Sequence, residues 1–130
     1  MLTDTTFRRI LWLSALGNLG GALLFALPAS PLGQWAGLPA DVPLLYRAFV
    51  ALFVLIYGGM YAWLAVQPVI HRPMVALAAI GKSSAFALVL LLWLLGEVTV
   101  MSVTLLAADL ALAAIYLAWL LQGPNRADSL

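Results

Sequence analysis

The sequence contains no cysteine and a single histidine, His71, among its 130 residues. Without cysteine the chain has no disulfides, thiolate catalysis, iron–sulfur clusters or CxxC redox pairs. One histidine does not make a zinc or diiron site by itself, so we expect no metal site. We assign no catalytic residue, because no nucleophile beside a base and no phosphate-binding loop is visible. Any redox role therefore requires a cofactor that other residues hold.

Charged residues are scarce as well. Lys, Arg, Asp and Glu make up 8% of the chain, against about 25% in a typical soluble domain. The net charge of +1 is not the basic footprint of a nucleic-acid-binding protein, which excludes nucleic acid as a partner. Hydrophobic residues make up 65%, and the mean hydropathy is +1.09. Such a chain has too little polar surface to cover itself in water, so we expect a lipid bilayer around it.

Four apolar stretches are long enough to cross a bilayer, which takes about 20 residues in a helix. They are residues 7–27, 44–66, 74–95 and 98–121. Proline or glycine lies in every gap and stops the helices there. The first stretch exceeds the roughly 7 to 15 apolar residues of a signal peptide, so we expect it to stay uncleaved. The predicted class is all-α: one integral membrane domain, 1–130, a four-helix transmembrane bundle with an interfacial connector at 28–43.

The orientation follows from the basic residues, which fall on one side of a four-span chain. They are Arg8, Arg9, His71, Arg72 and Arg126. The positive-inside rule then predicts that both termini are cytoplasmic. Tryptophans near both sets of helix ends predict two interfacial belts: Trp12, Trp63 and Trp119 on one side, Trp35 and Trp93 on the other. The connector that contains Trp35 either covers the bundle, which we favour, or acts as a lid.

Polar residues of all four helices fall at one depth, roughly 12 to 18 Å from the cytoplasmic helix ends. They are Asn18, Tyr57, Lys82 and Asp109. A charge at the bilayer centre costs about 2.5 to 3.5 kcal/mol, so Lys82 and Asp109 should face inward and form an ion pair. At the outer face, Arg47 and Glu97 lie at similar height and form a second candidate pair.

Two further patterns concern individual helix faces. Ser102, Asp109 and Tyr116 are spaced by seven and form a polar stripe, opposite a face of small alanines suited to packing against another helix. The second span carries aromatic residues within an arc of about 120°. They are Tyr46, Phe49, Phe53, Tyr57 and Tyr61. This aromatic face either packs inside the bundle or lines a slot for a flat or apolar ligand such as a quinone or lipid tail.

The arrangement resembles the DoxX-like group of small four-helix bacterial membrane proteins. The matching residues are Gly17, Asn18, Gly20 and Gly21, Leu32-Gly33, Arg47, Tyr57-Gly58, Gly81-Lys82 and Asp109. The resemblance implies a four-helix bundle in the bacterial inner membrane, and some members are associated with quinone-linked oxidation of sulfur compounds. Small multidrug exporters fit less well, because their first helix carries a glutamate where this chain offers Asn18.

The first functional hypothesis is a binding protein or accessory subunit of a membrane complex, with a quinone or lipid as the candidate ligand. The ligand-binding or polar-layer residues would be Asn18, Tyr57, Tyr61, Lys82, Asp109 and Tyr116. The alternative is a transporter of ions or proton-coupled small solutes, built as a homodimer, with Asp109 as the protonation switch. An intramembrane isomerase or lipid-modifying enzyme that uses Asp109 as acid or base ranks below both.

Overall fold

The computed structural model describes residues 1–123, and this part of the chain is entirely helical. Its elements are α1 (Asp4–Ala26), α2 (Pro31–Trp35), α3 (Leu44–Val66), α4 (Arg72–Leu94) and α5 (Val100–Leu121). All but α2 are long and apolar enough to cross a membrane. By length and composition the chain thus has four candidate membrane spans, which suggests a multi-pass membrane protein.

The helix boundaries differ from those of the apolar stretches where an N-cap, a proline or a glycine turn sets the first residue of a helix. The range of α3 is the predicted one. Helix α1 begins three residues before the predicted start at residue 7, because the Thr3 hydroxyl caps it by accepting a hydrogen bond from the Thr6 amide. Likewise α4 begins at Arg72, since Pro73 is well suited to a first helical turn. The turn before α5 contains Gly96 at a φ of +78° and delays that helix to Val100.

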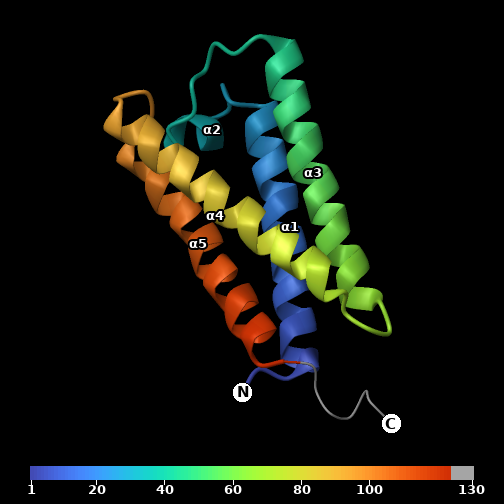
Figure 1. Cartoon of the computed structure of the whole chain (residues 1–130). Coiled ribbons are helices and arrows are strands. Elements are labelled where there is room, and N and C mark those ends of the chain that lie inside the picture. The colour runs from blue at the N-terminus through green and yellow to red at the C-terminus, as the bar shows by residue number, and fades with distance from the viewer. Residues whose placement is uncertain (124–130) are drawn as a thin grey trace.

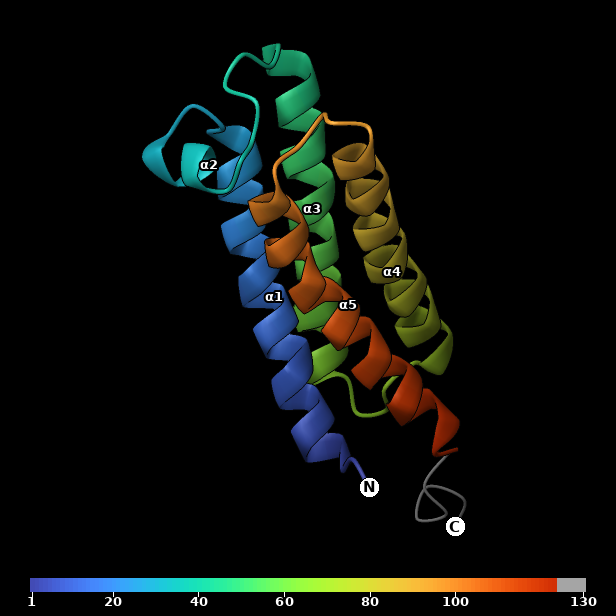
Figure 2. The same ribbon diagram turned by 90° about the vertical axis from the view of Figure 1, so that its left-hand side faces the viewer.

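The long helices are arranged as two pairs. Helix α1 packs along α3, and α4 packs along α5, whereas fewer contacts join one pair to the other. Figure 1 shows the pairs separating toward the end that carries α2, whereas in Figure 2 α5 starts beside α1 and slants away from it toward the opposite end, so the two pairs cross at an angle. The N-terminus, the α3–α4 loop and the end of α5 lie together at the opposite end. The two pairs are therefore inclined to each other.

The hydrophobic core lies at the N-terminal end, where the two pairs meet. The Phe7 ring stacks on Trp119 with centroids 4.4 Å apart and meets the Tyr116 ring edge-on at 5.5 Å. Trp119 is 7% exposed, and its indole nitrogen donates to the Asp4 carboxylate. The assignment of Trp119 to an interfacial belt was wrong, because this side chain packs in the core. Trp12, Trp63, Trp35 and Trp93 are exposed near the helix ends.

The connector, residues 28–43, docks onto the start of α5. The Ser30 hydroxyl caps α2 by accepting from the Gly33 amide. The Ser102 hydroxyl of α5 donates to the Ala36 carbonyl over 2.9 Å. Gly37 has a φ of +79°, and a Cβ there would lie 2.0 Å from Thr99 Oγ1. The connector is therefore a cover held against the bundle.

We expect Gly37→Ala to weaken this docking more than Gly96→Ala. Both glycines have a positive φ, which costs an alanine about 1 to 2 kcal/mol. Only at Gly37 does the added methyl also displace Thr99, because nothing lies within 4 Å of the position at Gly96. Limited proteolysis should cut the connector several-fold faster in Gly37→Ala. Equal cleavage of the two variants would show that Gly37 is needed only for its backbone conformation.

Candidate functional site

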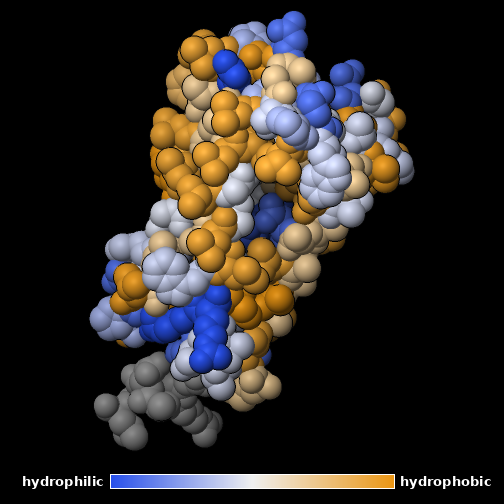
Figure 3. Space-filling view, turned by 180° about the vertical axis from the view of Figure 1, so that it is seen from behind, coloured by the Kyte–Doolittle hydropathy of each residue, from blue (hydrophilic) through white to orange (hydrophobic). Residues whose placement is uncertain are grey.

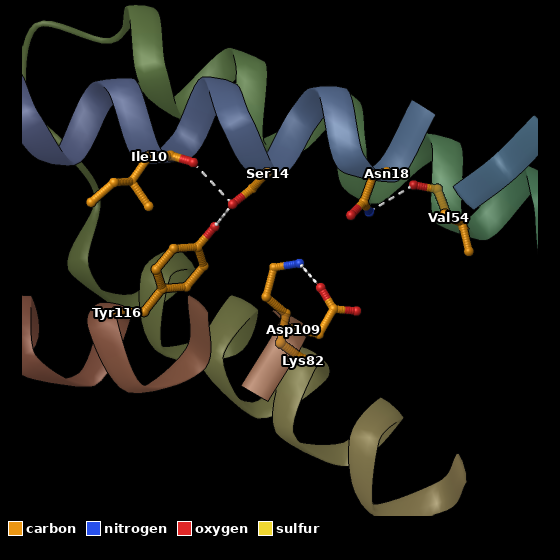
Figure 4. A network of polar contacts seen from close by, with 7 residues as sticks. All are labelled: Ile10, Ser14, Asn18, Val54, Lys82, Asp109 and Tyr116. Atoms are coloured by element: carbon orange, nitrogen blue, oxygen red, sulfur yellow. Dashed lines mark hydrogen bonds and ion pairs between the residues drawn. The ribbon is translucent and has the colours of Figure 1, made fainter. Parts of the chain in front are cut away.

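The predicted ion pair forms in the middle of the bundle. Lys82 Nζ of α4 lies 2.5 Å from Asp109 Oδ1 of α5, as Figure 4 shows. The same ammonium lies 5.0 Å from the centroid of the Tyr61 ring of α3. Lys82 is only 4% exposed, whereas the Asp109 side chain is 30% exposed. The cation is enclosed by protein, and the anion is open on one side.

Pairing lowers the free-energy cost of placing the two charged side chains of Lys82 and Asp109 in an apolar environment. A lysine or aspartate at the bilayer centre costs about 2.5 to 3.5 kcal/mol alone, and pairing lowers that cost. Within residues 1–123 it is the one ion pair with a nitrogen–oxygen distance of 4.0 Å or less. The ring of Tyr61 adds a cation–π contact on the buried side.

A second polar contact is sealed inside the core. The Ser14 hydroxyl of α1 donates to the Ile10 carbonyl over 3.0 Å. Its oxygen lies 2.5 Å from the Tyr116 hydroxyl of α5, which must be the donor because the Ser14 proton is already engaged. Both side chains are essentially unexposed. Tyr116 therefore joins α5 to α1 through a buried hydroxyl.

Asn18 lies on α1, one turn beyond Ser14. Its amide nitrogen donates to the Val54 carbonyl of α3 over 3.0 Å. Figure 4 shows the side chain on the opposite side of the gap from the Lys82–Asp109 pair. The amide is partly buried and belongs to the same layer as the ion pair. We call Asn18, Lys82 and Asp109 the polar layer.

The polar stripe of α5 faces the interior, and each of its members contacts a different element. Ser102 binds the connector, Asp109 binds α4, and Tyr116 binds α1. The seven-residue spacing predicted a shared face but not these three partners. The contact between Ser14 and Tyr116 was not predicted from the sequence. The sequence does place Ser14 four residues before Asn18, and therefore on the same face of α1.

The aromatic face of α3 is divided between two environments, which corrects the picture of one continuous lining. Tyr61 is buried in the core, and Tyr57 is partly buried beside Gly81, where a Cβ would lie 3.4 Å from its ring. Tyr46, Phe49 and Phe53 are more than half exposed on the outside of the molecule. These five rings therefore do not line a single slot.

Arg47 and Glu97 do not form the expected outer pair, which corrects that assignment. The Arg47 Nη1 group instead donates to the Ala26 carbonyl, 3.2 Å away, at the last residue of α1. Carbonyls at helix C-termini lack intrahelical donors and carry partial negative charge, so an arginine satisfies one well. Arg47 Nε is buried without a hydrogen-bond partner among the described residues. Glu97 is exposed on the α4–α5 turn.

Basic side chains at the N-terminal end of the bundle also donate hydrogen bonds to backbone carbonyls near helix C-termini. Arg8 donates to the Ala65 and Pro68 carbonyls, at 2.8 and 3.0 Å. Arg72 donates to the Leu120 carbonyl and lies over the Trp119 ring. The His71 ring stacks on Trp63. Arg126, which contributes to the predicted orientation, lies outside the described residues.

No group of three or more His, Asp or Glu side chains placed to hold a metal ion occurs in residues 1–123. Comparison with protein-family models, with curated proteins and with solved structures finds no match to this chain.

Proposed function

We propose that this membrane protein binds an apolar molecule with a polar head, a quinone or a lipid, at the polar layer. The observation that carries the proposal is the unequal exposure of the ion pair, 4% for Lys82 and 30% for Asp109. A purely structural pair would be sealed like the Ser14–Tyr116 contact. On the face drawn in Figure 3, hydrophilic atoms lie recessed among hydrophobic side chains near the middle of the molecule.

The chemistry of the layer suits a small hydrogen-bonding head. The Asp109 carboxylate is paired with Lys82 through Oδ1, and on its exposed side it keeps capacity to accept further hydrogen bonds. A hydroxyl on the ligand would donate to Asp109, which Lys82 holds in place, and a carbonyl would accept from Asn18. The apolar remainder of the ligand would stay in the surrounding lipid. Such a division of contacts is typical of apolar sites with a few polar groups.

The proposal includes insertion with both termini in the cytoplasm of a bacterial cell, in the inner membrane, as in the DoxX-like group. Its support is the clustering of Arg8, His71 and Arg72 at one end of the bundle. The exposed tryptophans near both ends are in keeping with it.

An accessory role in a larger complex, or a homodimer, is the second candidate. The observation that favours it is the small face of α5, which lies on the outside of the molecule. Ala107, Ala111, Ala114 and Ala118 are all exposed there. Small residues let a second helix approach closely in a membrane, so a partner helix would fit this face.

The binding proposal predicts a copurifying ligand that depends on the polar layer. Protein extracted gently from its own membrane should retain a quinone or lipid in native mass spectrometry. Asp109→Asn and Lys82→Met should each lower ligand occupancy about tenfold, because a hydrogen bond to a charged group contributes about 1.5 to 3 kcal/mol. Occupancy is measured on the monodisperse fraction from size-exclusion chromatography, so that only folded protein counts.

Tyr116→Phe is the matched control. It removes a hydroxyl from the same face of α5 as Asp109, but one that is sealed in the core, and should leave occupancy unchanged. Wild-type protein without any retained small molecule, or equal occupancy in all variants, would contradict the proposal. In that case, liposome flux that is lost in Asp109→Asn would support the transporter alternative.

A further inference from the structure

A separate pocket lies at the α2 end, far from the polar layer. It has a volume of about 160 Å³ and is formed where the connector crosses between α1 and α3. Phe25 comes from α1, Leu38 and Val42 from the connector, and Tyr46 and Val50 from α3. Apart from Arg47, the side chains that line it are apolar or aromatic. We call it the outer pocket.

Arg47 brings an uncompensated positive charge to this pocket. Within residues 1–123 no carboxylate lies within 4.0 Å of its guanidinium nitrogens. Of its five N–H donors, one is bound to the Ala26 carbonyl, and Nε has no partner. The residue is partly exposed and lies four residues into α3, near the end of that helix. A residue one turn into a spanning helix lies near the level where lipid headgroups meet hydrocarbon.

The size of the pocket indicates what it holds. Sites for whole small ligands measure about 300 to 1,000 Å³, so 160 Å³ accommodates only part of a molecule. A segment of an acyl chain has the right shape and polarity for such a space. Arginine binds phosphate oxygens through two parallel N–H groups, which supplies the matching contact for the head.

We infer that the outer pocket binds an anionic phospholipid from the leaflet at the α2 end, with an acyl segment in the pocket and its phosphate at Arg47. The inference does not depend on the ligand of the polar layer. It also explains why the connector folds over the end of α1 instead of extending into solvent: it completes one side of the lipid site.

The test is native mass spectrometry of protein in nanodiscs of equimolar phosphatidylglycerol and phosphatidylcholine. Wild-type protein should retain phosphatidylglycerol about tenfold more than phosphatidylcholine. Arg47→Gln should abolish this preference. Arg9→Gln, at an exposed arginine of the opposite end, makes the same change in net charge and should leave the preference intact.

A second variant guards against damage to the fold, since Arg47 also contacts Ala26. Val50→Trp fills the pocket but keeps Arg47, and should lower retention of phosphatidylglycerol about fivefold or more. Inorganic phosphate in millimolar excess should not displace the lipid. The inference is overturned if wild-type protein shows no preference, if Arg47→Gln retains it, or if free phosphate displaces the lipid and Val50→Trp has no effect.

Discussion

Asp109→Leu should lower the free energy of unfolding by about 3 to 5 kcal/mol, the largest effect that we expect for a single polar substitution in this chain. The variant leaves the Lys82 ammonium enclosed at 4% exposure without an anion. The Tyr61 ring alone does not replace a carboxylate at 2.5 Å. The lysine cannot reach water from this depth without displacing the packed helices around it.

Lys82→Met should cost less, about 1 to 3 kcal/mol, because Asp109 is partly exposed and keeps access to other hydrogen-bond donors. The double variant Lys82→Met/Asp109→Leu should recover most of the stability, since buried ion pairs are often replaced by apolar residues without loss. Thermal and denaturant unfolding in detergent measures all four proteins as a double-mutant cycle. Equal losses in the two single variants would contradict the unequal enclosure of the pair.

Gly58→Leu should separate α1 from α3, and Gly59→Leu should not. A Cβ at Gly58 would lie 3.1 Å from the Asn18 Cβ and 3.4 Å from the Ala15 carbonyl oxygen. Overpacking at such a contact costs about 1 to 3 kcal/mol, and the clash also strains the Asn18–Val54 hydrogen bond. Nothing lies within 4 Å of the position at Gly59, where leucine improves helix propensity by up to about 1 kcal/mol.

The two variants are compared by thermal unfolding in the same detergent. Gly58→Leu should unfold at a clearly lower temperature, and Gly59→Leu at or above that of the parent. A disulfide between cysteines introduced across α1 and α3 would report the separation of the helices directly. Similar unfolding temperatures for the two variants would show that the close approach at Gly58 is not needed.

The spanning helices could be predicted from composition because a bilayer imposes a length and a polarity on whatever crosses it. The range 44–66 coincides with α3 for that reason. The starts of α1 and α4 lie three and two residues before the apolar stretches, because the Thr3 cap and the Arg72–Pro73 turn fall outside an apolar pattern. The Lys82–Asp109 contact was also predictable, because two opposite charges at equal depth have few other ways to avoid lipid.

The sequence determined that this chain consists of apolar helices with a paired charge at mid-depth, since hydropathy and helical rise depend only on the order of residues. Which surfaces meet was decided by the tertiary structure. In the tertiary structure Tyr61 of α3 is buried in the core, whereas Phe53 of the same helix is exposed. Arg47 forms a hydrogen bond with the carbonyl at the end of α1, and not the ion pair with Glu97 that the sequence suggested. In lipid both faces of an apolar helix are equally acceptable, so hydropathy does not choose between them, and only close packing and hydrogen bonding do.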